Sequence, residues 1–89
     1  MEGLSKIYYK NQTITYVNYS IFQSDPQQKQ KMLALLKYVQ DERLTQPPNS
    51  ALVLVNVANL GFDMETLKYF KESLERTEPY DKKTAVVGV

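Results

Sequence analysis

Ala51-Leu52-Val53-Leu54-Val55-Asn56-Val57-Ala58 is apolar except at Asn56 and rich in β-branched residues. A short run of this composition is typical of a buried strand. Both alternating sets of side chains are apolar, so we expect both faces of the strand to be covered, as in the parallel sheets of α/β folds. A loop at residues 59–63 follows, and a helical pattern begins directly after it.

Length and composition indicate one domain spanning residues 1–89. A chain of this size forms a single core, and 43% hydrophobic with 24% charged residues is ordinary for a globular protein. The formal net charge is only +1, with basic and acidic residues interspersed, so we expect no nucleic-acid partner. The sequence contains no apolar run long enough to span a bilayer, so we expect no membrane association.

The absence of two residue types excludes several kinds of catalytic and metal-binding site. The sequence contains no cysteine and no histidine, which excludes disulfides, thiolate or histidine metal sites and histidine-based catalytic triads. We therefore expect no metal and no cofactor. Residues 1–6 lack an apolar signal core, so the expected location is the cytoplasm.

The N-terminal region has the pattern of a β-hairpin. Residues 6–10 and 13–21 are rich in Ile, Val, Thr and Tyr, and the polar pair Asn11-Gln12 separates them. We expect the second strand to be the inner one. Four tyrosines concentrate here and form either a ligand platform or cross-strand packing, of which we favour packing: Tyr8, Tyr9, Tyr16 and Tyr19.

The first helix has a complete start signal. Asp25 is the expected N-cap, Pro26 the first helical residue and Gln28 the third. The helix should extend to about Arg43 and pack on a sheet through one apolar stripe, made of Met32, Leu35, Leu36 and Val39 and widened by Leu33. Pro47 and Pro48 then require an irregular connection.

The second helix should begin after Asp63, its expected N-cap, and end before Pro79. Its expected buried stripe is Met64, Leu67, Phe70 and Leu74. Residues 83–89 have the pattern of a final strand. The sequence thus predicts an α/β fold: an N-terminal β-hairpin followed by two βαβ units, giving a mixed four-stranded sheet with two helices.

Ligands of open α/β sheets gather at the carboxyl ends of parallel strands. The candidate ligand- or partner-binding residues there are Asn56, Asn59, Gly61 and Asp63, together with Ser20 after the second strand. The loop matches no phosphate-binding or dinucleotide fingerprint. The competing interpretation is structural, with the asparagines satisfying loop backbone and Asp63 capping a helix. We identify no catalytic residue.

Three segments resemble a known family. Residues 15–20 (TYVNYS), 54–63 (LVNVANLGFD) and 79–89 (PYDKKTAVVGV) look like small bacterial STAS-like proteins, relatives of anti-sigma-factor antagonists. Such proteins usually carry Asp where Asn18 and Asn56 stand here, and they continue past the last strand. The resemblance implies a non-catalytic regulatory domain that works through protein partners. In its phosphoregulated members a Ser caps the helix after the central strand, a position taken here by Asp63.

The preferred function is therefore a non-enzymatic, STAS-like protein-interaction module. The alternative is a small-molecule or nucleotide sensor that uses the loop after the central strand. Two helices cover about one face of a four-stranded sheet, because a helix is about 10 Å wide and strands lie about 4.8 Å apart. We therefore also expect a homodimer that buries the second face or pairs an edge strand.

Overall fold

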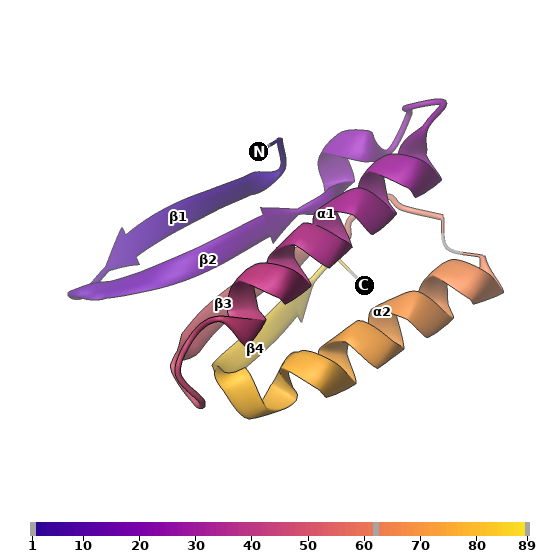
Figure 1. The fold of residues 1–89 in the computed structure, drawn as a ribbon. Helices are drawn as coiled ribbons and strands as arrows, with labels where there is room; N and C mark the ends of the chain where they lie inside the picture. Colours follow the sequence, from indigo (N-terminus) through magenta and orange to yellow (C-terminus); the bar gives the residue numbers. More distant parts are fainter. Residues whose placement is uncertain (1, 62, 89) are drawn as a thin grey trace.

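Four strands and two α-helices form the fold in the computed structural model, which describes residues 2–61 and 63–88. Two short 3₁₀ turns, η1 and η2, complete it (Figure 1). In chain order the elements are β1 Leu4–Tyr9, β2 Gln12–Asn18, η1 Tyr19–Phe22, α1 Gln28–Leu44, β3 Ala51–Asn56, α2 Met64–Thr77, η2 Glu78–Tyr80 and β4 Asp81–Val87.

The sheet has the order β1-β2-β3-β4, and this confirms the predicted mixed sheet with the second strand inside. β1 and β2 are antiparallel, whereas β2, β3 and β4 are parallel. Both helices lie on the same face of the sheet (Figure 1). The strand order advances in one direction from β2 to β4, so the two crossovers have the same hand.

The hairpin turn consists of Lys10 and Asn11, both with positive φ (49° and 63°), as in a type I′ turn. β2 ends at Asn18, three residues before the expected end at position 21, because residues 19–22 form the η1 turn. The Asn18 side chain accepts a hydrogen bond from the Ser20 amide at 3.1 Å, which caps this turn. The outer tyrosines do not pack as expected: Tyr8 is 79% exposed, whereas Tyr19 is buried.

Helix α1 begins two residues later than its start signal predicted. Asp25 accepts a hydrogen bond from the Gln27 amide at 2.7 Å, and Gln27 rather than Asp25 is the N-cap. Asp25 and Pro26 thus form a turn before the helix, because the carboxylate bonds two residues ahead instead of capping the first helical turn. The predicted stripe is correct, with Met32, Leu35 and Val39 buried and Leu36 packed against them.

The predicted buried stripe of α2 is wrong. Its buried residues are Thr66, Ser73 and Thr77, whereas Leu67 and Leu74 are 46% and 41% exposed. The helix is rotated so that these small polar side chains are buried in place of its leucines, and α2 also packs on α1. Of the expected stripe, only Phe70 reaches the core, and Met64 is 80% exposed.

The core lies between the sheet and the helices. Val53 and Val55 of β3 are buried against this side, and the ring of Phe70 packs edge-on to buried Tyr19 at 5.0 Å between centroids. The alternate residues of β3, Leu52 and Leu54, are only partly buried. The expectation that both faces of β3 are covered is therefore wrong for the single chain, because both helices pack on one face.

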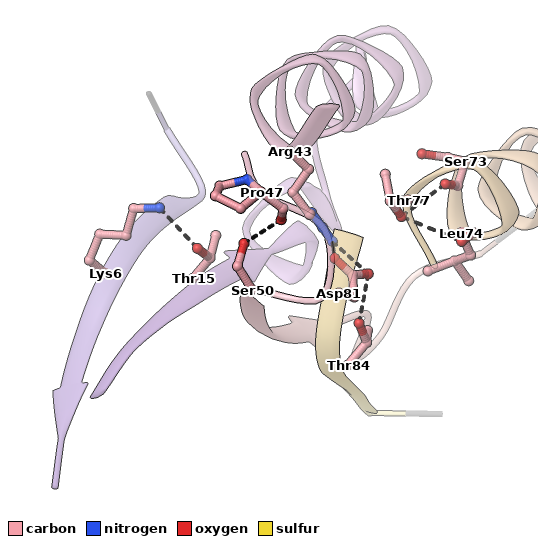
Figure 2. Close-up of polar contacts among 10 residues, drawn as sticks. All are labelled: Lys6, Thr15, Arg43, Pro47, Ser50, Ser73, Leu74, Thr77, Asp81 and Thr84. Atoms are coloured by element: carbon pink, nitrogen blue, oxygen red, sulfur yellow. Dashed lines mark hydrogen bonds and ion pairs between the residues drawn. The ribbon is translucent and has the colours of Figure 1, made fainter. Parts of the chain in front are cut away.

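A buried ion pair joins α1 to the start of β4. Nη1 of Arg43 lies 2.9 and 3.0 Å from the two carboxylate oxygens of Asp81, and the Thr84 hydroxyl donates to the same carboxylate at 2.9 Å (Figure 2). Both charged side chains are about nine-tenths buried, with 10% and 7% exposure. Burial lowers the pKa of Arg43, and Asp81 opposes that shift. Sequence reasoning missed this contact, although Arg43 continues the buried stripe four residues after Val39.

Candidate functional site

The polar residues at the carboxyl ends of β2 and β3 bond mainly to one another and to nearby backbone. Asn56 donates from Nδ2 to the hydroxyl oxygen of Tyr16 at 3.1 Å and accepts from the Ala58 amide at 2.9 Å. The Ser20 hydroxyl donates to Asn18 Oδ1. Asn18 and Asn56 are paired in the register of β2 and β3, so this edge of the sheet holds a row of side-chain amides.

Asp63 is the N-cap of α2, as predicted. Its Oδ1 accepts a hydrogen bond from the Thr66 amide at 2.7 Å, and Lys29 of α1 lies 3.2 Å from its other oxygen. These bonds, above all those from Thr66, lower the pKa of Asp63 to about 2. The side chain is 56% exposed and the carboxylate stays ionised at neutral pH, so it cannot serve there as a general acid, and its lowered pKa makes it a weak base.

A polar hollow lies between the first turns of the two helices, and Gly61 and Asp63 line it together with residues of α1. Its charges are already matched, since Lys29 also binds Glu65 at 2.8 Å and Lys31 pairs with Asp25. A Cβ at Gly61 would meet no atom within 4 Å, so no close approach in the folded chain requires glycine there. The hollow thus contains helix caps and their counter-ions.

Asn59 does not line this hollow but lines an apolar groove between α2 and β4. It has positive φ (60°), as loop asparagines tolerate, and is exposed. The groove has a volume of about 390 Å³ and is lined chiefly by apolar side chains: Val57, Leu60, Leu67, Phe70 and Val86. The structure therefore separates the five candidate residues into a capping row (Ser20, Asn56), a polar hollow (Gly61, Asp63) and this groove (Asn59). Phe62, between them in the chain, lies outside the described residues.

A larger feature, which includes only Asn56 of the predicted site residues, is the face of the sheet opposite the helices, which we call the open face. Alternation along the strands and their register place one side chain in two on this face. Its apolar members come from all four strands and are Ile7, Ile14, Leu52, Leu54, Ala85 and Val87. Ile7 and Val87 are 38% and 43% exposed, and a shallow depression runs over Ile14, Leu52, Leu54 and Ala85.

The open face is poor in charge, and two of its polar side chains are paired with each other. Lys83 is the one residue with a formal charge among the described strand residues that point to it, and it stands on the edge strand. The hydrogen bond from Asn56 to Tyr16 lies on this face and satisfies polar atoms that would otherwise need water. The sequence signal for the face was the apolar character of both alternating sets in residues 52–57.

Comparisons with family models, with curated proteins and with solved structures found no match to this chain. Within residues 2–61 and 63–88, no group of three or more acidic side chains is placed to hold a metal ion. None of the helices in that part of the chain is long and apolar enough to cross a membrane.

Proposed function

We propose that this chain is a non-catalytic protein-interaction domain that binds its partner through the open face of the sheet. The observation that carries the proposal is the composition of that face: apolar side chains from all four strands, interspersed with uncharged polar ones, and one charge at the margin. Exposed apolar surfaces of this extent mark interaction sites, and depletion of charge distinguishes the centres of interfaces.

A regulatory role for the domain follows from its resemblance to STAS-like proteins and is part of the proposal. In the phosphoregulated members of that family a serine caps the helix after the central strand. Here the cap is Asp63, with its charge held by Thr66 and Lys29. We therefore propose a cytoplasmic module whose cap carries a permanent negative charge, and whose interactions do not require phosphorylation at this position.

Affinity capture from the native cell extract tests the interaction function. Wild-type chain is compared with Leu54→Asp, which places a charge in the centre of the open face, and with Leu67→Asp, which places one in the α2–β4 groove. The proposal predicts that the captured protein, whether another chain or further copies of this one, is lost with Leu54→Asp and kept with Leu67→Asp. Capture that is unaffected by Leu54→Asp would contradict it.

The second candidate is a small-molecule sensor that uses the α2–β4 groove. A volume of about 390 Å³, an aromatic residue and a single amide at Asn59 are features of small-ligand sites. Titration with an apolar fluorescent probe distinguishes the two functions. Saturable binding that Leu67→Asp abolishes and Leu54→Asp leaves intact favours the sensor, and the reverse pattern favours the interaction domain.

A further inference from the structure

The open face is the strongest unexplained feature, and its size can be compared with what an interface needs. Each strand contains six or seven residues. At about 3.3 Å per residue and about 4.8 Å between strands, four strands cover roughly 400 Å² in projection. The accessible surface of projecting side chains is larger than this, so two such faces in full contact bury more than about 800 Å² in total. That area exceeds most incidental contacts and is near the lower limit of about 1,000 Å² for a specific interface.

The charge pattern of the face argues for a partner of the same kind. With Lys83 alone at the margin, a basic or acidic partner finds almost no counter-charge, whereas a second copy meets almost no repulsion. Two polar side chains of the face do not oppose burial either, because Asn56, at the end of β3, bonds both to Tyr16 and to the Ala58 amide. An apolar surface can therefore lie on them without leaving the amide of Asn56 unpaired.

The burial of the single chain is also incomplete. Among the described residues, eight hydrophobic residues form the buried core and twelve large hydrophobic residues are exposed, of which Ile7, Tyr9 and Val87 point to the open face. A contact between two identical faces removes both from water at once and closes the assembly at two copies. A different partner would remove one face only and would need a matching apolar surface of its own.

We propose that the partner on the open face is a second copy of this chain, giving a symmetric dimer in which the two sheets pack face to face. The proposal rests on the proposed interaction function and names its partner. Packed sheets lie about 10 Å apart with strand directions about 30° from one another. In the dimer, Leu52, Leu54 and Ile14 of each copy form the centre of a sandwich, with the helices of both copies on the outside.

The test is the molar mass of the purified chain by light scattering after size exclusion. Area alone does not determine the affinity of an interface, so the dilution series is wide and extends from about 1 µM to about 1 mM. We expect a transition between the 10.3 kDa of one chain and twice that mass. A single 10.3 kDa species, or species larger than a dimer, across the whole series overturns the proposal.

Three variants locate the contact. Leu54→Asp and Ala85→Asp place a charge on the open face and should each weaken dimerisation at least about thirtyfold, as the loss of an interface hot spot does. Leu67→Asp, in the α2–β4 groove, should dimerise as the wild type does. Ala85 is exposed on an edge strand, so its variant keeps the test valid if Leu54→Asp does not fold, as judged by circular dichroism.

The outcomes separate this inference from the proposed function. A dimer lost with Leu67→Asp and kept with the two open-face variants overturns the inference and places the contact in the groove. A monomeric wild type overturns it as well, but leaves the interaction function intact if Leu54→Asp still abolishes capture of another protein. If the wild type is monomeric and Leu54→Asp also leaves capture unchanged, both the inference and the proposed function are overturned.

Discussion

Arg43, in the last turn of α1, donates from Nη1 to both carboxylate oxygens of Asp81, the first residue of β4. The pair joins segments 38 positions apart and fixes the end of the first helix against the start of the last strand. Nε of Arg43 is buried without a hydrogen-bond partner among the described residues, so the guanidinium depends on Asp81 for its compensation. A charge this deeply buried is costly once its partner is removed.

Asp81→Ala should therefore lower the free energy of unfolding by about 3–5 kcal/mol, because it leaves a buried, unpaired guanidinium. The double variant Arg43→Met/Asp81→Ala should recover much of this loss, since it removes the buried charge and keeps the apolar stem. Urea denaturation of the wild type, both single variants and the double variant forms the complete cycle. Equal losses in the Asp81→Ala and double variants would show that the ion pair is not the cause.

Adjacent residues of β3 face opposite sides of the sheet and provide a matched pair of substitutions. Val55 is 7% exposed in the core, so Val55→Asp places an unpaired carboxylate there at a cost of several kcal/mol, against a total stability of roughly 5–15 kcal/mol. Leu54→Asp meets the open face and should cost only about 1–2 kcal/mol in the monomer. Thermal unfolding by circular dichroism measures both. A cooperative transition for Val55→Asp near that of the wild type would contradict the observed core.

Two glycines form another matched pair. Gly3 has a φ of +84°, and a Cβ there would lie 2.9 Å from the Asn18 carbonyl oxygen and 2.9 Å from a methyl group of Leu35. Gly3→Ala should therefore destabilise the fold by about 1–3 kcal/mol. At Gly61 the φ angle is not positive and an added Cβ would contact no atom. Gly61→Ala should therefore leave the free energy of unfolding unchanged or raise it by up to about 1 kcal/mol. Comparison of the two denaturation midpoints decides whether the loop requires a glycine.

We expect the stability of the chain to fall at low pH because the N-cap of α2 is a carboxylate. The pKa of Asp63 is lowered to about 2 in the folded chain, below the value of about 3.9 for an unfolded aspartate. Its contribution to stability is therefore complete above about pH 4 and is lost as the pH falls toward 2. Asp63→Ser keeps an N-cap acceptor and removes the charge, so its stability should depend less on pH in this window. Unfolding curves of both proteins from pH 5 to about pH 2 provide the measurement, and identical slopes would exclude Asp63 as the source.

The sequence predicted the order of elements and the α1 stripe because both depend on local patterns: β-branched runs, a cap and helical periodicity. It failed at one local signal, the expected Asp25 cap of α1, and where the packing of two elements determines the result. The periodicity of α2 placed Met64, Leu67 and Leu74 on one side of the helix, yet it could not show that Thr66, Ser73 and Thr77 would be buried instead. Likewise, the apolar character of Leu52 and Leu54 predicted that other elements cover this face of β3. Only the position of both helices on the opposite side shows that the face is uncovered in the single chain.

The candidate site was predicted from topology, which places residues at a sheet edge but does not determine their partners. Asn56 and Ser20 lie at the predicted strand ends, and their side chains bond to Tyr16, Ala58 and Asn18. Asp63 could be assigned correctly because capping is local. Asn59 lines the α2–β4 groove whereas Gly61 and Asp63 line the polar hollow, and no spacing in the sequence predicts this separation.

The turn at Lys10 and Asn11 bears on the speed of folding. Every strand pairing except β1–β2 connects segments separated by a whole helix, so the hairpin is the one strand pair that can close early. Its two central residues both occupy the left-handed region without a glycine, which makes that early step costly. We expect Lys10→Asn/Asn11→Gly to accelerate refolding in stopped-flow experiments and to change unfolding little. An unchanged refolding rate would indicate that the chain nucleates instead where α1 meets the parallel strands.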